Sequence, residues 1–145
     1  MNFKFISILL GLLFAISLVY ATLDTASSLN DLPRLKNTVN EGLNHLPGLV
    51  RIFLGNLDIN VHYTLNQSVR EFNLVLNGGL VDSLQEVSTQ HPDLDLYVSD
   101  QDVQDISNAA NVRTEIKNKL NNNQLRIETH GIIALVKLRF AKTFL

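Results

Sequence analysis

The strongest constraint on the fold is a strict alternation of apolar and polar residues between positions 57 and 66. The apolar members are Leu57, Ile59, Val61, Tyr63 and Leu65, and every residue between them is polar. Because successive side chains of a strand point to opposite faces of a sheet, this pattern predicts a strand with one face buried. The chain therefore needs a sheet that is covered on one side.

Four further segments carry strand patterns and extend this sheet. The predicted strands cover residues 69–77, 80–87, 94–98 and 125–128. Short polar or glycine-containing turns, such as Asn77-Gly78-Gly79, favour antiparallel hairpins between the first strands. We therefore expect the first four strands to form a meander and the fifth to join it later.

Helices are predicted before, between and after these strands, where apolar residues recur at three- and four-residue spacing. The predicted helices cover residues 31–46, 49–54, 99–108, 112–120 and 132–145. This order predicts an α+β domain with a five-stranded, mostly antiparallel sheet covered by helices. The last helix is mostly apolar, so it needs cover on more than one face.

The N-terminus carries an uncharged apolar run over residues 5–23, preceded by Lys4. Its end is typical of an export signal cleaved after Ala21. A bilayer core needs roughly 20 apolar residues, so a retained membrane anchor stays the alternative. We expect a signal peptide or anchor in residues 1–23, a linker in 24–30 and a domain in 31–145. Either alternative places the domain outside the cytoplasm, secreted or membrane-anchored, where the sequon Asn66-Gln67-Ser68 would fit.

Composition excludes several classes of function. Hydrophobic residues make up 46% of the chain and charged residues 18%, which excludes a disordered tail. The net charge of −2 comes without a basic block, so we expect no nucleic-acid partner. The chain has no cysteine, which excludes disulfides and thiolate chemistry.

No known pattern of catalytic or metal-binding residues is visible. The histidines lie far apart in sequence, without paired ligand spacing, at His45, His62, His91 and His130. We therefore expect solvated or capping histidines and no metal site. Motifs that pair a nucleophile with a base are also missing, so neither an enzyme nor a cofactor is expected.

The second half of the chain carries a characteristic series of segments. They are an acidic strand that begins Pro92-Asp93-Leu94, a polar helix start at Ser99-Asp100-Gln101-Asp102, a helix at 111–120, a strand at 124–129, and Gly131 before the helix at 132–145. In this order they resemble the sterol carrier protein type 2 (SCP-2) family of sterol-transfer domains. Residues 57–87 fit the earlier strands of that family, so the resemblance covers most of the predicted domain.

The resemblance implies a hydrophobic tunnel between sheet and helices that takes a lipid, a sterol or a fatty-acyl ligand. It thus predicts non-enzymatic lipid binding and transfer outside the cytoplasm. The residues expected to line the tunnel are apolar: Val61, Tyr63, Leu74, Leu76, Leu96, Val98, Leu120, Ile127, Leu135, Leu138 and Phe140. Each could instead simply fill a core. The alternative function is a membrane-tethered protein-interaction module that keeps the fold but has no open tunnel.

Overall fold

The computed structural model describes residues 31–45 and 48–132. The predicted signal or anchor, the linker up to residue 30, and residues 133–145 of the last predicted helix lie outside this part. Those predictions therefore stay untested by the structure. Among the described residues, no helix combines the length and the apolar character needed to cross a membrane.

In the described part of the chain, two helices precede the first strand and two more lie between the fourth and fifth strands. In chain order the elements are α2 (Leu32–Asn44), α3 (Gly48–Leu54), β1 (Leu57–Leu65), β2 (Ser68–Asn77), β3 (Leu80–Gln85), β4 (Leu94–Ser99), α4 (Asp100–Asn108), α5 (Val112–Asn121) and β5 (Arg126–Thr129). The α+β class and all five predicted strands are confirmed, with bounds that differ by no more than about two residues.

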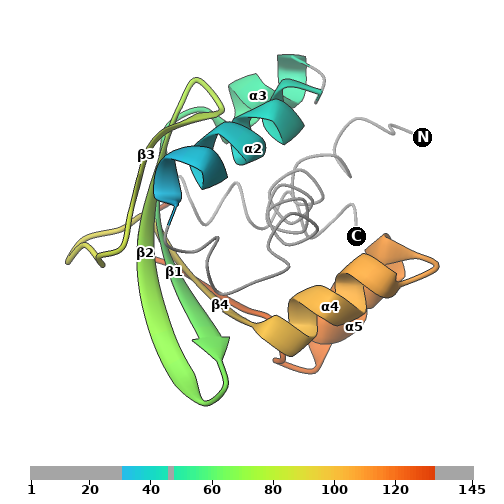
Figure 1. Cartoon of the computed structure of the whole chain (residues 1–145). Helices are drawn as coiled ribbons and strands as arrows, with labels where there is room; N and C mark the ends of the chain where they lie inside the picture. Colours follow the sequence, from blue (N-terminus) through green and yellow to red (C-terminus); the bar gives the residue numbers. More distant parts are fainter. Residues whose placement is uncertain (1–30, 46–47, 133–145) are drawn as a thin grey trace.

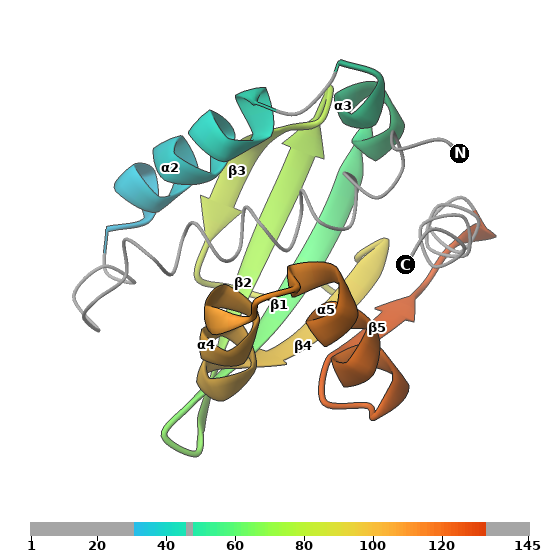
Figure 2. The same ribbon diagram turned by 90° about the vertical axis from the view of Figure 1, so that its right-hand side faces the viewer.

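The predicted four-strand meander is wrong. The strand order is β3-β2-β1-β4-β5, so β4 lies beside β1 and not beside β3 (Figure 2). β4 runs parallel to β1, whereas the other neighbouring pairs are antiparallel. Alternation fixes which face each side chain takes, but it does not fix which strands become neighbours. The apolar β4 is thereby paired on both edges, whereas β3 takes the edge of the sheet.

All four described helices lie on one side of the curved sheet (Figure 1). α2 packs on β3, and α4 packs on β4 and β1 as well as on α5. The apolar side chains of the strands face this side and form one core with Leu35, Val39 and Leu43 of α2. The opposite side of the sheet carries the polar residues of the alternation, as the sequence predicts for a sheet covered on one side.

The edge strand β3 is closed by an asparagine of α2. The Val81 backbone N–H donates to Asn40 Oδ1 over 2.6 Å, and Asn40 Nδ2 donates to the Val81 carbonyl over 2.9 Å. The amide of Asn40 thus replaces the backbone of a missing neighbouring strand. An unpaired edge is prone to pairing with other chains, so this contact protects it.

The α4–α5 pair is held by a buried lysine. Ser99 and Asp102 form a capping box at the start of α4. Lys119 of α5, only 2% exposed, donates to Asp102 Oδ1 over 3.0 Å and to Asp105 Oδ2 over 2.7 Å. Burial lowers the pKa of Lys119, but the hydrogen bonds to Asp105 and Asp102 outweigh it and leave the pKa above its ordinary value. A charged core residue therefore connects the two helices.

Candidate functional site

The predicted tunnel residues of the strands share the covered face of the sheet. Val61 lies opposite Phe72 of β2 and Leu96 of β4, and Leu96 lies opposite Ile127 of β5. Directly paired residues point to the same face, so these four form an apolar row across four strands. The other predicted tunnel residues of the strands lie on the same face: Tyr63, Leu74, Leu76 and Val98.

These side chains differ in how deeply they are buried. Leu76 and Leu96 are 1% exposed, and Tyr63 and Val98 are also buried. The partly buried residues pack against this core, and they are Val61, Leu74, Ile127 and, on α5, Leu120. Leu135, Leu138 and Phe140 lie outside the described residues. The structure therefore places eight of the predicted residues at the covered face, and their contact with a ligand stays a prediction.

Tyr63 also has a polar function on this face. Its hydroxyl donates to Asp100 Oδ1 over 2.7 Å, at the start of α4. Burial raises the pKa of the Tyr63 phenol, and the hydrogen bond and negative charge of Asp100 raise it further. The phenol stays protonated and links β1 to α4, which positions the helix over the sheet.

The open face of the sheet carries a polar cleft of about 450 Å³. Its lining comes from β1 and β4, from the loop between β3 and β4, and from His130, which directly follows β5. The residues that line the cleft are Asn60, His62, Ser88, Thr89, Gln90, His91, Pro92, Asp93, Asp95, Tyr97 and His130. Three histidines and two carboxylates thus surround one cleft, although they come from distant positions in the sequence.

Asp95 is the centre of this polar face. His62 Nε2 donates to its Oδ1 over 2.7 Å, and His130 Nε2 donates to its Oδ2 over 2.5 Å. Burial raises the pKa of Asp95, but hydrogen bonds from His62, His130 and Asn60 outweigh it, so the pKa lies below its ordinary value. Asp95 is therefore a carboxylate held in a nearly buried position, with 12% of its side chain exposed.

His62 is fixed in orientation from three directions. Its ring stacks on Tyr97, with 4.4 Å between ring centroids and 10° between the planes. Nδ1 contacts Glu71 Oε1 over 3.1 Å, and Nε2 contacts Asp95. Each ring nitrogen of His62 thus lies within hydrogen-bond distance of a carboxylate oxygen. The ring therefore bridges the carboxylates of β2 and β4.

The loop wall of the cleft is held by a buried asparagine. Asn60 Nδ2 donates to the Thr89 carbonyl over 2.9 Å, and the Thr89 backbone N–H donates to Asn60 Oδ1 over 3.0 Å. Asn73 Nδ2 also donates to Asn60 Oδ1, over 3.2 Å. Asn60 is 3% exposed, so these contacts are made away from water. The loop between β3 and β4 is thereby fixed to β1.

We expect Asn60→Ala to lower the free energy of unfolding by about 1–3 kcal/mol, because it leaves the Thr89 backbone groups without these partners. Urea denaturation measures this change. Hydrogen exchange at the Thr89 amide should accelerate as the loop opens. The control Asn118→Ala, at an exposed position of α5, should stay within about 0.5 kcal/mol of wild type. Equal effects of the two substitutions would contradict the proposed anchoring of the loop.

The sequence did not predict this polar cluster. Asp95 and Glu128 alternate with apolar residues of their strands, as His62 does, so all three lie on the outward face, but the sequence set β4 after β3 in a meander. With β4 beside β1, His62 lies opposite Tyr97 and next to Asp95. The expectation that the histidines are merely solvated or capping is wrong for His62, which lies between two carboxylates with 16% of its side chain exposed, whereas His130 is exposed and also contacts Asp95. The alternation pattern predicts on which face of the sheet these side chains lie, but only the order of the strands brings them together.

Comparison with known proteins gives a likeness in structure alone. No family model and no curated protein sequence matches the chain. The solved structure of sterol carrier protein 2 like 2 from Aedes aegypti aligns over 77% of this chain and 90% of its own, with a TM-score of 0.52 and 13% identity. The chain has an SCP-2-type fold. The resemblance stated from the sequence is thereby confirmed at the level of the fold.

A second solved SCP-2-type structure agrees. The ubiquinone synthesis protein UbiJ-SCP2 aligns over 77% of this chain and 96% of its own, with a TM-score of 0.50 and 13% identity. Both alignments cover nearly the whole of the known domain. At this identity the likeness shows the SCP-2-type fold and does not carry over the ligand of either protein.

Proposed function

We propose that this SCP-2-type domain binds and transfers an apolar, lipid-like ligand on the covered face of its sheet, without catalysing a reaction. The observation that carries the proposal is the apolar row from β2 to β5, which lies under helices in a fold shared with a sterol carrier protein. Sterols and fatty-acyl chains are the ligand chemistry that fits such a surface.

The physical basis is the burial of apolar surface. Transfer of one CH₂ group from water to an apolar site contributes about 0.8 kcal/mol, so a long acyl chain can bind without a polar anchor. Val61 and Ile127 are only partly buried although they face the covered side. These partly buried side chains are the positions where a ligand would remove further apolar area from water.

We also propose that the protein acts outside the cytoplasm, either secreted or anchored in a membrane. This proposal rests on the uncharged apolar run at residues 5–23, which is typical of an export signal or an anchor. Expression of the full chain in secretion-competent cells, followed by fractionation and intact mass measurement, tests it. A mature chain that begins after Ala21 supports secretion, an uncleaved chain in the membrane supports an anchor, and a cytosolic full-length chain contradicts both.

The ligand proposal is tested with full chain purified from cells under native conditions. We expect native mass spectrometry to show a bound lipid, and organic extraction to release it for identification. A fluorescent fatty acid added to delipidated protein should bind and be displaced by the extracted lipid. Protein that carries no lipid and binds no fluorescent probe would contradict the proposal and favour the interaction module.

We expect Val61→Trp to reduce binding of the fluorescent probe at least tenfold while changing stability little, because a bulky side chain would fill the ligand's space. The matched control is Val69→Trp, at a β2 position that is 59% exposed and leaves binding unchanged. If Val61 instead packs in a filled core, the larger side chain should cost about 1–3 kcal/mol in stability. That result, with unaltered or absent probe binding, would count against a ligand at this face.

A further inference from the structure

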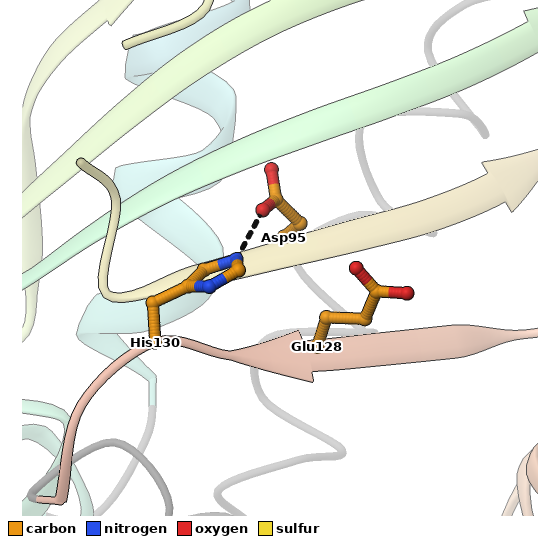
Figure 3. Close-up of side chains that lie close together, drawn as sticks. All are labelled: Asp95, Glu128 and His130. Atoms are coloured by element: carbon orange, nitrogen blue, oxygen red, sulfur yellow. Dashed lines mark hydrogen bonds and ion pairs between the residues drawn. The ribbon is translucent and has the colours of Figure 1, made fainter. Parts of the chain in front are cut away.

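The open face of the sheet holds a group of ligating side chains that the proposed lipid binding does not use. Asp95 lies on β4, and Glu128 lies opposite it on β5. His130 follows two residues after Glu128, so all three side chains project from the same side of the sheet (Figure 3). Each offers one ligand atom, and these atoms lie within 4.8 Å of one another.

We propose that Asp95, Glu128 and His130 form a binding site for a divalent transition-metal ion of the Zn²⁺ class. An imidazole nitrogen with two carboxylate oxygens is a mixed ligand set that such ions accept, whereas Ca²⁺ and Mg²⁺ prefer oxygen alone. Zn²⁺ bonds to nitrogen and oxygen ligands at about 2.0–2.2 Å, which places two ligand atoms about 3.4 Å apart. The three ligand atoms lie within 4.8 Å of one another, so binding of the ion requires their side chains to adjust to that spacing.

The hydrogen bond from His130 to Asp95 marks the position of the ion. The proton of this hydrogen bond lies between His130 Nε2, which donates, and Asp95 Oδ2, which accepts. A divalent cation can replace that proton, since it is attracted to the same lone pairs. His130 is 44% exposed on its side chain, so its ring can move outward to admit the ion.

Neighbouring groups support the two carboxylate ligands. Asp95 Oδ1 accepts from His62 Nε2, and Tyr97 and Glu71 hold that ring in place. Glu128 Oε1 contacts Arg126 Nε over 3.3 Å, and the Tyr97 hydroxyl donates to Glu128 Oε2 over 3.4 Å. Outer hydrogen bonds of this kind orient metal ligands and strengthen binding.

The cleft leaves room for further ligands of the ion. Asp95 and His130 line its wall, and His91 and Asp93 line the same cleft. A site with three protein ligands leaves a fourth position for water. The carboxylates of Asp93 and Asp95 add negative charge on this side, which attracts a cation.

The test is titration of metal-free full chain with Zn²⁺ at neutral pH, by calorimetry and by competition with a chromophoric chelator. We expect one Zn²⁺ per chain and a raised unfolding temperature, because an ion that binds only folded protein stabilises it. Mg²⁺ and Ca²⁺ should not compete. The control His45→Ala removes an exposed histidine at the end of α2 and should leave affinity unchanged.

His130→Ala and Glu128→Gln should each lower Zn²⁺ affinity at least tenfold. Glu128→Gln keeps the shape of the side chain, and circular dichroism verifies that both variants fold. Absence of one-to-one binding in the micromolar range, or binding that both substitutions leave unchanged, would overturn the inference. The site lies on the face opposite the apolar row, so its failure would leave the lipid proposal intact.

Discussion

Lys119→Ala should lower the free energy of unfolding by about 3–5 kcal/mol, which is the usual cost of removing one partner from a buried ion pair. The substitution leaves Asp102 and Asp105 without their shared cation, and Asp102 is 6% exposed. Asp102 also caps α4, so disturbance of its carboxylate should spread to the start of that helix. Urea denaturation followed by circular dichroism measures the loss.

The matched control for this experiment is Lys117→Ala on the same helix. Lys117 is exposed, so its removal should change stability by no more than about 0.5 kcal/mol. Equal losses from the two substitutions would show that Lys119 has no buried partners. Asp102→Asn combined with Lys119→Met should recover part of the loss, because no unpaired charge then remains at Asp102.

Acid titration gives a second measure of the same contact. Hydrogen bonds from Lys119 and Gln101 hold the pKa of Asp105 below its ordinary value of 3.8. A carboxyl with a lowered pKa in the folded state contributes stability above its unfolded pKa and loses it as pH falls through the folded pKa. Wild type should therefore lose stability below about pH 4, and Lys119→Ala should lose less over that interval.

Gly79→Ala is expected to cost about 2–5 kcal/mol, from two separate causes. The turn between β2 and β3 gives Gly79 a φ of +76°, where a side chain is strained by about 1–2 kcal/mol. A Cβ at this position would also lie 2.2 Å from the Arg51 carbonyl oxygen of α3. Because that oxygen belongs to the backbone, either α3 or the turn must move. Thermal and urea unfolding measure the cost.

Gly78→Ala is the control that separates these two causes. Gly78 has a φ of +60°, but a Cβ there would meet no atom within 4 Å. It should therefore show the backbone strain of about 1–2 kcal/mol without the steric clash. A loss from Gly79→Ala no larger than that from Gly78→Ala would contradict the close contact between the turn and α3.

Secondary structure was largely readable from the sequence, because its signals are local. The alternation from Leu57 to Leu65 gave β1, and the asparagine and glycine residues gave the two hairpin turns. Ser99 with Asp102 gave the start of α4. Periodicity also predicted α5, yet it gave no sign that Lys119 is a core residue, since lysine is ordinarily exposed.

The polar cleft was not readable in the same way. Its residues come from β1, β4, the β3–β4 loop and the position that directly follows β5, and no short motif connects them. The spacing of His62, His91 and His130 argued against a shared site because it was judged along the chain. In the folded protein, the parallel pairing of β1 with β4 brings His62 to Asp95.

The sequence by itself determined the α+β class, the strands, the described helices and, except in β3 where the register shifts, the face to which each strand residue points. These follow from local periodicity and turn chemistry, which act within a few residues. Only the tertiary structure decided that β4 pairs with β1, that Lys119 is buried between two aspartates, and that two histidines meet at Asp95. Such contacts depend on which distant segments become neighbours, and alternation leaves that choice open because several strand orders bury the same apolar face.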